Sequence, residues 1–339
     1  MFSKKIISWY LKNKRDLPWR NTRNPYKIWL SEIILQQTRI AQGLPYYYKF
    51  TEKYPSLEDL AKAEIDDVLR LWQGLGYYSR GRNLHFTAKQ IWFECGGEFP
   101  ESFEGLKKLK GIGNYTAAAI VSFAFGKKVP AIDGNALRVF SRIYGIDAPI
   151  DDSSTIKSIF GLASELIENV DPALFNQGIM ELGATVCTPK SPKCDHCPVR
   201  IDCTAFDKKL QEKLPYKSKK IKVIDRNISY YILIFEDKIW LKQRGTEDIW
   251  AGLYDFFESE LPEILSKKTI SGSFFQKHIL THQRLGIDFK YIFLDEIIMF
   301  PGGRFYTIPE IEELPKPKVI DDAFKRMKEV LGNENFRLQ

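Results

Sequence analysis

Apolar residues in the first 205 positions recur every three to four residues, and this spacing predicts a series of amphipathic helices. The first covers residues 2–13. Another begins at Asn24-Pro25, where asparagine suits the cap and proline the first turn, and runs to Thr38. Further helical stretches are predicted after Pro55-Ser56, at 102–109, from Tyr115, and from Asp171-Pro172 to Gly183. This part of the chain is therefore predicted to be mainly α.

The pattern changes beyond residue 206. Residues 207–226 are strongly basic and lack periodicity, which is typical of a linker. The stretches 228–235 and 238–244 are rich in β-forming residues and predict a hairpin that turns at Glu236-Asp237. Similar character continues at 250–257 and 289–293, and a last helix is expected at about 321–331. We therefore expect two domains, a helical one at 1–206 and an α+β one at 227–339.

Composition narrows the class of protein. The chain has 339 residues, 44% of them hydrophobic, with a formal net charge of +7 and a pI of about 8.9. This charge suits a polyanionic partner without requiring one. No apolar run reaches the length of a membrane span. Four of the five cysteines fall within residues 187–203, a spacing typical of metal binding in a reducing compartment, so a cytosolic protein is expected.

The cysteine-rich segment is a candidate metal site. Cys187, Cys194, Cys197 and Cys203 lie in one short loop that several prolines stiffen. Four thiolates in such a loop make a closed four-coordinate site, and their chemistry alone allows either zinc or a [4Fe–4S] cluster.

Glu32 is unusual within the helix that begins at Pro25. Its neighbours on the same helical face are Ile28, Trp29 and Leu35. A carboxyl group on an apolar face loses hydration, so its pKa should rise towards the range that a general acid needs near neutral pH. The alternative is a glutamate at the edge of the stripe whose carboxylate reaches water.

Asp133 is a second candidate site residue. It lies where another helix is predicted to begin, about 100 residues after Glu32. Its ordinary role would be an N-cap, and its functional role a carboxylate that faces a developing cation. Both can hold together, because one oxygen can cap the helix while the other faces a site.

Two segments could contact a nucleic acid. Residues 109–121 join two helices through Gly111 and Gly113, and a helix start behind a tight glycine turn can bind a phosphate without reading a base. Residues 71–84 place two tyrosines beside arginines, a combination that can wedge between bases while the cations hold phosphates. The alternatives are an ordinary turn between helices and an aromatic helix cap.

Taken together, these motifs resemble the MutY family of adenine DNA glycosylases, which belongs to the helix-hairpin-helix superfamily. The resemblance is densest before residue 205 and rests on these segments: 17–20, 29–38, 74–78, the 109–121 hairpin, 132–135, 175–177 and the cysteine loop. It implies a two-lobed helical unit, with a six-helix lobe at about 25–128 and an iron–sulfur lobe at about 1–24 and 129–206. The α+β half is similar to the MutT-like (Nudix-like) domain of that family.

The resemblance also implies an activity, namely removal of adenine mispaired with 8-oxoguanine or guanine in double-stranded DNA by a monomeric enzyme. Glu32 matches the acid that protonates adenine, Asp133 the carboxylate that stabilises the cationic sugar, and Tyr115 a tyrosine beside the scissile sugar. The four cysteines match the ligands of a [4Fe–4S] cluster. Arg15, Trp19, Arg20 and Gln177 match positions in the adenine pocket of the family. Gln37, Thr38 and Tyr77 match positions near the place in the DNA duplex that the flipped adenine leaves.

The lesion-reading loop of the family has a Phe-Ser-His pattern, and here the matching stretch is Leu280-Thr281-His282. Thr281 can replace the serine hydroxyl and His282 is kept, whereas Leu280 replaces the aromatic residue. We therefore expect this domain to read the lesion, with the degree of discrimination against plain guanine left open. The alternative is that His278 and His282 are solvated histidines at strand ends.

Three other functions are compatible with parts of this sequence. A lyase-competent glycosylase similar to endonuclease III would carry a nucleophilic lysine where this chain has Tyr115, so a monofunctional enzyme is expected. A nucleotide pyrophosphatase would need the acidic Nudix box, and Glu247, Glu258, Glu260 and Glu263 lack its core pattern. A catalytically silent DNA-binding or redox protein would not need both Glu32 and Asp133.

Overall fold

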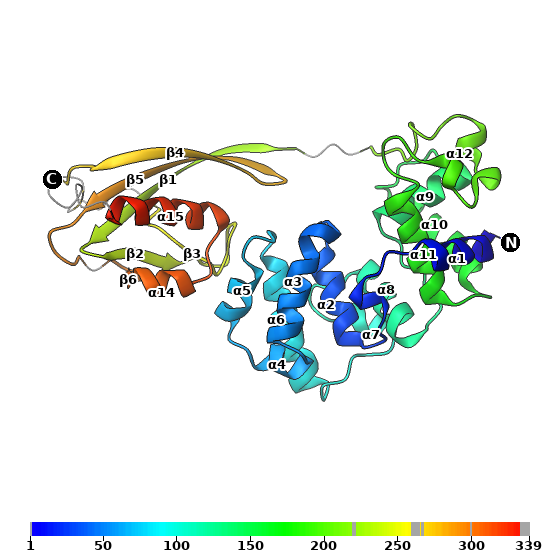
Figure 1. Cartoon of the computed structure of the whole chain (residues 1–339), viewed down its shortest axis with the longest axis horizontal. Helices are drawn as coiled ribbons and strands as arrows, with labels where there is room; N and C mark the ends of the chain where they lie inside the picture. Colours follow the sequence, from blue (N-terminus) through cyan, green and yellow to red (C-terminus); the bar gives the residue numbers. More distant parts are fainter. Residues whose placement is uncertain (1, 219–221, 259–264, 266–267, 299, 333–339) are drawn as a thin grey trace. The chain divides into compact units, whose positions relative to one another are not determined.

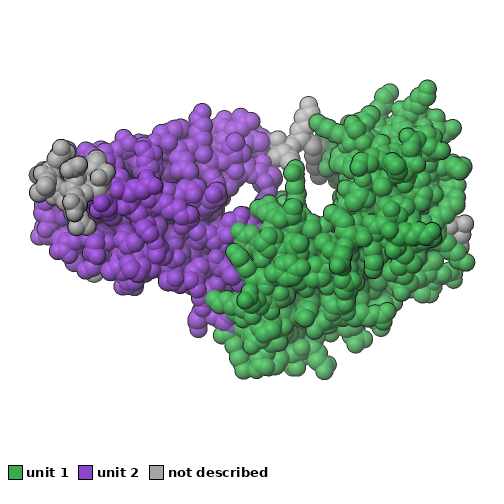
Figure 2. Space-filling view, viewed as in Figure 1, with its two compact units in different colours: residues 1–62, 83–220 green, residues 63–82, 221–339 purple. Residues whose placement is uncertain are grey.

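A computed structural model describes residues 2–218, 222–258, 265, 268–298 and 300–332. The chain forms two compact units, shown in different colours in Figure 2: residues 1–62 with 83–220, and residues 63–82 with 221–339. Residues 63–82 were expected in the helical domain, but they group with the unit that contains the sheet. The expected linker at 207–226 includes residues 219–221, which lie outside the described part.

The first unit is built from helices (Figure 1). Their bounds are α1 Phe2–Asn13, η1 Pro18–Arg20, α2 Pro25–Leu35, α3 Ile40–Lys53, α4 Leu57–Lys62, α6 Ser79–Lys89 (whose first turn belongs to the second unit), η2 Gln90–Glu94, α7 Phe103–Lys107, α8 Asn114–Phe125, α9 Gly134–Tyr144, α10 Ser153–Ile167, α11 Pro172–Thr185, η3 Cys194–His196, η4 Arg200–Asp202 and α12 Thr204–Asp207.

Side-chain caps begin these helices where the sequence predicts them. Asn24 accepts a hydrogen bond from the Lys27 amide at the start of α2, and Asp171 accepts one from Leu174 at the start of α11. Ser56 and Asp59 bond reciprocally at the start of α4, as expected of a capping box. The predicted helix starts are therefore confirmed.

The predicted end of one helix was wrong. The helix α2 ends at Leu35 rather than Thr38, because Gln37 adopts a φ of +57° that no right-handed helix contains. In the turn before α8, only Gly111 uses the left-handed region, with φ +79°, whereas Gly113 is an extended residue with φ −87°. A side chain at Gly111 would also approach Asn83 within 2.9 Å, so both space and backbone favour glycine there.

The core of the first unit has two parts. Ile6 of α1, Phe140 of α9, Ile159 of α10 and Phe175 of α11 belong to one apolar cluster, and three of the cysteines pack against it. The helices α2 and α8 pack together elsewhere in the unit and are buried on most of their surface. Helices that are apolar on every side belong in a protein interior, and this explains why a polar residue within α2 loses its contact with water.

The second unit contains a mixed six-stranded sheet in the order β3-β2-β1-β5-β4, with β6 paired to β2. The strands β1 and β5 run parallel, and the other pairs are antiparallel. The expected hairpin at Glu236-Asp237 is confirmed. The bounds are β1 Ile224–Phe235, β2 Lys238–Gln243, β3 Tyr254–Asp255, β4 Gly272–Ile279, β5 Gln283–Phe293 and β6 Gly303–Thr307, with the helices α5 Ile65–Trp72, α14 Ile308–Glu313 and α15 Lys318–Gly332.

The helix α15 covers one face of this sheet (Figure 1). Its Val319, Ile320, Phe324 and Met327 pack against buried residues of β1, β2 and β5. A smaller cluster that includes Trp240 and Ile292 occupies the other face. The predicted fold class, a mainly α part followed by an α+β part, is confirmed, although β4, β6 and α14 were not predicted.

Residues 63–82 join the second unit through polar contacts. The Tyr78 hydroxyl donates to the Lys316 carbonyl at 3.1 Å, and the Arg82 guanidinium donates to the Ala251 carbonyl at 2.6 Å. The Lys316 amide donates to Gln73 at 3.3 Å. These bonds explain why α5 and the tyrosine-containing turn group with residues far along the chain.

Candidate active site and cysteine loop

One cavity of about 650 Å³ in the first unit brings together most of the predicted site residues. Its walls come from η1, α2, α8, α11 and the segment that leads into α9. The predicted residues that line it are Arg15, Trp19, Arg20, Glu32, Gln37, Thr38, Tyr115, Asp133 and Gln177. These predicted residues are spread over more than 160 positions of the sequence, and in the structure they line one cavity. Gly111 and Gly113 do not line it.

Glu32 lies in the middle of α2 and is 7% exposed. Burial, and to a smaller extent the nearby charge of Asp133, raise the pKa of its carboxyl group, which is about 7 instead of the usual 4.5. A hydrogen bond with Tyr115 and the charge of Arg20 oppose this rise. The carboxyl group is thus poised to hold a proton near neutral pH, as a general acid must.

Tyr115 lies in the first turn of α8 and is half-buried. Besides its bond with Glu32, its hydroxyl contacts the Met180 sulfur at 3.8 Å. Burial, together with the charges of Glu32 and Asp133, raises the pKa of the phenol well above its usual value. Tyr115 therefore stays a neutral hydroxyl that is hydrogen-bonded to Glu32 in the cavity that Asp133 also lines.

Asp133 is the N-cap of α9, and its two oxygens have different partners. Its Oδ1 accepts the Ala136 amide at 2.7 Å, and its Oδ2 accepts the Asn135 amide group at 2.7 Å. Arg138 in turn holds the Asn135 oxygen at 2.8 Å. Burial raises the pKa of Asp133, while the bonds from Ala136 and Asn135 oppose that rise. The capping role is therefore real, and the same group lines the cavity.

Glu181 of α11 is a site residue for which the sequence suggested no role. It is fully buried, and it binds both Arg15 and Arg20, at 2.7 Å and 2.6 Å. These arginines lower the pKa of its carboxyl group to about 2. The sequence did carry a signal, because Glu181 stands among apolar helical neighbours just as Glu32 does.

Tyr10 is a second residue that sequence reasoning missed. Its hydroxyl donates to the Gln177 amide oxygen at 2.6 Å, and its ring lies 5.5 Å from the Arg20 guanidinium. Because the amide oxygen is held from behind, the NH₂ group of Gln177 remains as the donor. In α1 this tyrosine belonged to a predicted apolar stripe, so nothing in the local pattern marked it.

The glycine turn before α8 lies outside the cavity but has the geometry of an anion site. Thr87 holds the turn by a 2.7 Å bond to the Lys110 carbonyl. In the described chain no side chain caps the first turn of α8, so its amide groups remain open to an anion.

Three predicted residues lie together in the second unit instead. Tyr77, Thr281 and His282 line a cavity of about 580 Å³ with Trp250 and His278, and the Tyr77 hydroxyl is hydrogen-bonded to Thr281. Tyr77 has a φ of +48°, an uncommon conformation for a tyrosine. Thr281 and His282 are exposed in the turn between β4 and β5.

The acidic residues weighed for a Nudix box do not form an open cation site where they are described. Glu258 is bound to Arg244, which also binds Asp248 and Asp255. Glu260 and Glu263 lie outside the described residues.

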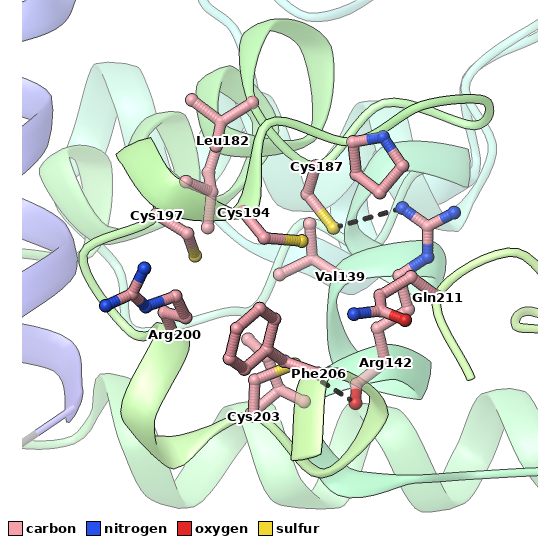
Figure 3. Close-up of a pocket in the computed structure, with 13 residues that line it drawn as sticks. Val139, Arg142, Leu182, Cys187, Cys194, Cys197, Arg200, Cys203, Phe206 and Gln211 are labelled. Carbon is pink, nitrogen blue, oxygen red and sulfur yellow. Dashed lines mark hydrogen bonds between the residues drawn. The ribbon is translucent and has the colours of Figure 1, made fainter. Parts of the chain in front are cut away.

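The four cysteines of the loop surround a single cavity beside α9, α11 and α12 (Figure 3). Arg142, which is 2% exposed, donates to the Cys187 sulfur at 3.4 Å and to the carbonyls of Thr188 and Pro189. Among the described residues, no group of three or more His, Cys, Asp or Glu is arranged around a single-ion position. Four convergent thiols with apolar walls nevertheless fit a cysteine-bound iron–sulfur group in chemistry.

Comparison with known proteins identifies the family. The family model of HhH-GPD superfamily base excision DNA repair proteins matches residues 30–161, and a NUDIX domain model matches residues 230–326. The adenine DNA glycosylase of Buchnera aphidicola subsp. Baizongia pistaciae is 34% identical over 339 residues and 94% of each chain. That of subsp. Schizaphis graminum is 35% identical over 78% of this chain and 77% of its own. The chain belongs to the adenine DNA glycosylase (MutY) family.

Other relatives agree with this assignment. The human adenine DNA glycosylase is 46% identical over 63% of this chain and 41% of its own. A thermostable thymine-DNA glycosylase structure has a TM-score of 0.55 at 31% identity, over 61% of this chain and 95% of that one. An endonuclease III–DNA intermediate, with a TM-score of 0.53 at 22% identity, covers the same shares and shows the same fold. The chain is therefore a base excision repair glycosylase that acts on adenine in DNA.

Within the described residues of this adenine glycosylase, none of the helices has both the length and the apolar character that a membrane crossing requires.

A glycine in α11 supports the position of Asp133 and yields a stability prediction. A methyl group at Gly183 would meet the Asn135 backbone and Cβ at 2.6–3.2 Å, so Gly183→Ala should reduce the free energy of unfolding by about 1–3 kcal/mol. Gly161→Ala is the matched control, because Gly161 is exposed within α10 with open space around it, and it should stabilise by about 0.5–1 kcal/mol. Urea unfolding followed by helical circular dichroism measures both, and equal effects would contradict the close contact.

Glu32 should also make stability depend on pH. The unfolded chain ionises Glu32 near pH 4.5 and the folded chain near pH 7, so the folded state holds the proton longer and loses stability as the pH rises between them. Glu32→Gln cannot ionise. Between pH 5 and 8, its free energy of unfolding should therefore rise by about 3 kcal/mol relative to that of the unmodified protein. Urea unfolding at several pH values tests this, and a difference that is the same at every pH would refute the buried acid.

Proposed function

We propose that this glycosylase hydrolyses the N-glycosidic bond of adenine opposite 8-oxoguanine or guanine, and that it does so without cutting the strand. The observation that carries the proposal is the cavity in which Glu32, Tyr115 and Asp133 meet at the junction of α2, α8 and α9. Two carboxyl groups in unlike environments, with a neutral hydroxyl in the same cavity, suit acid-assisted departure of a base.

Glu32 acts as the general acid. Adenine leaves poorly as an anion, and a proton delivered to its N7 turns it into a neutral leaving group. A carboxyl group whose pKa is raised to about 7 by burial still carries that proton at neutral pH. Two features hold the Glu32 side chain in position: the rigid backbone of α2 and the hydrogen bond with Tyr115.

Asp133 stabilises the positive charge that develops on the sugar as the base leaves. Its oxygens are held by the Ala136 amide and by Asn135, so the carboxylate is oriented before the substrate arrives. Orientation by neutral donors leaves its negative charge available to the sugar. The same charge also raises the pKa of Glu32, so the two groups reinforce their opposite roles.

The cavity receives an extruded adenine, because the base cannot be reached inside a duplex. Trp19 lies on its wall, packed edge-on against Tyr47 at 5.0 Å, and Gln177 presents its NH₂ group as described above. Arg15 and Arg20 complete the adenine-contacting side. Gln37 and Thr38 follow the end of α2, where Gln37 is exposed and can fill the space that the base vacates.

A monofunctional reaction is supported by the side chains that line the cavity. None of its described lining residues is a lysine, and Tyr115 stands where a lyase would carry its amine. Without an amine no Schiff base forms with the sugar, so the product is an intact strand with an abasic site. The glycines Gly111 and Gly113, with the open start of α8, bind a backbone phosphate and contribute no chemistry.

Recognition of the opposite base belongs to the second unit. Thr281 and His282 lie at an exposed turn, and Tyr77 is bonded to Thr281. A hydroxyl and an imidazole can both donate and accept hydrogen bonds, which suits the altered edge of 8-oxoguanine. Tyr77 supplies the aromatic surface on which the neighbouring base stacks.

The four cysteines hold a [4Fe–4S] cluster, which orders the loop and takes no part in hydrolysis. Arg142 contacts one thiol and two loop carbonyls, so it braces the ligands from outside. The apolar side chains of α9 and α11 exclude water from the same cavity.

The experiment that tests the reaction is a single-turnover assay on a duplex with one adenine opposite 8-oxoguanine, read with and without hot alkali. Strand breaks should appear only after alkali, and Glu32→Gln should lower the rate by at least about a hundredfold, as expected for loss of general acid catalysis. Adenine opposite thymine is the control and should remain intact.

The other outcomes are also informative. Breaks without alkali would replace the monofunctional assignment with a lyase, and full activity of Glu32→Gln would remove the acid from its role. Thr281→Val keeps the shape of the side chain without its hydroxyl. It should slow excision opposite 8-oxoguanine more than opposite guanine, whereas equal slowing would contradict its part in lesion reading.

A separate prediction concerns the cluster. Arg142→Lys should lose most of the hydrogen bonds that the guanidinium makes to the Cys187 sulfur and to two carbonyls of the cysteine loop. Iron should therefore be lost to a chelator about tenfold faster. Arg200→Lys is the matched control in the same loop, because the described contacts of the Arg200 side chain are with the exposed Asp195 and the Phe206 ring and not with a cysteine sulfur, and its iron loss should be unchanged. Iron and sulfide analysis with visible absorbance measures both, and a preparation that binds zinc instead would overturn the assignment.

A further inference from the structure

Glu181 cannot take part in the reaction directly, because its carboxylate is already fully engaged. Its Oε1 accepts bonds from the Arg15 Nε at 2.7 Å and from the Arg15 amide at 3.2 Å. Its Oε2 accepts bonds from the Arg15 Nη2 at 2.7 Å and from the Arg20 Nη2 at 2.6 Å. A fully buried carboxylate with four such partners has no free site for a base or a proton.

The arrangement determines both the position and the charge of the adenine-contacting wall. Arg20 is pinned by Glu181, by the Arg15 carbonyl at 3.1 Å and by the Tyr10 ring. Two guanidinium groups alone would give this wall a charge of +2, and the ionised Glu181 reduces it to +1. Arg20 is nearly buried, with 8% of its side chain exposed, so water screens its charge poorly.

That charge acts on Glu32. The ionisable groups that face Glu32 are Tyr115 from α8, Asp133 from the start of α9 and Arg20 from η1. Of these, Arg20 is the only one whose charge favours the ionised carboxylate, which cannot donate a proton. An uncompensated pair of arginines would therefore drive Glu32 towards ionisation, and it would also repel an adenine that becomes cationic when it is protonated.

We propose that Glu181 is a positioning residue for adenine excision, which holds Arg15 and Arg20 in place and cancels enough of their charge to keep Glu32 protonated. This inference rests on the proposed function, because it assumes that Glu32 is the general acid. Glu181 acts through the arginines and does not touch the substrate.

The test is the pH dependence of the single-turnover rate on adenine opposite 8-oxoguanine, from pH 5 to 9, for four proteins. The net charge of the trio Arg15, Arg20 and Glu181 is +1 in the unmodified protein, +2 in Glu181→Gln, 0 in Arg20→Gln, and +1 again when both substitutions are combined. The alkaline fall of the rate reports loss of the proton from Glu32.

We expect the alkaline midpoint to follow that charge. In Glu181→Gln it should move to lower pH by about one unit, so that the rate falls about tenfold at pH 8.5 and less than about twofold at pH 5.5. In Arg20→Gln it should move to higher pH. The double variant should regain the original midpoint even if its maximum rate is lower, which a purely structural role would not produce.

Midpoints that stay in place while the rates fall equally at all pH values would overturn the proposal. If Glu181→Gln does not fold, as judged by circular dichroism and iron content, the shift in Arg20→Gln and an unshifted profile in Glu181→Asp, which keeps the charge, still decide it. Failure of the unmodified protein to excise adenine, or full activity of Glu32→Gln, would instead refute the proposed function.

Discussion

The structure depends on keeping one carboxyl group away from water. Glu32 lies inside α2, a helix that is buried along most of its length, so its ionised form is disfavoured by the loss of hydration. An isolated buried carboxylate costs several kcal/mol, and proteins usually avoid that cost by protonation. In the proposed mechanism the protonated form is the one that donates to adenine, so the same burial that weakens the fold would prepare the acid.

The other site groups are arranged around this constraint by helix ends. Asp133 is the N-cap of α9, where the Ala136 amide orients its carboxylate, and Tyr115 lies in the first turn of α8. Arg20 lies in a short 3₁₀ segment, and Arg15 lies in the loop before it. Rigid elements therefore carry the groups that need fixed positions, and the long, charged side chains come from segments that can adapt.

Local signals explain what the sequence could predict. Asn24, Asp133 and Asp171 cap helices through their nearest neighbours, and Glu32 interrupts an apolar stripe, so each is visible in a short window. Tyr10 and Glu181 acquire their roles only from partners far along the chain, and no window contains both ends of such a contact. The strand β4 was missed because its residues are only half-buried or exposed, and the strand is held by its pairing with β5.

The assignment of residues 63–82 to a domain also depends on contacts with residues far along the chain. Their grouping with residues 221–339 rests on hydrogen bonds to backbone carbonyls, such as those of Ala251 and Lys316. Backbone carbonyls carry no sequence signature. Only the structure could therefore assign this segment, with its wedge candidate Tyr77, to the unit that contains Thr281.

The bond between Arg15 and Glu181 joins residues 166 positions apart, so the two sides of the adenine cavity are synthesised at different times. During translation, α2 and α8 can fold while α11 is still unmade, and contacts of such long range form late. The cavity wall that contains Arg15, Arg20 and Glu181 is therefore complete only once α11 has been made and α1 has packed against it.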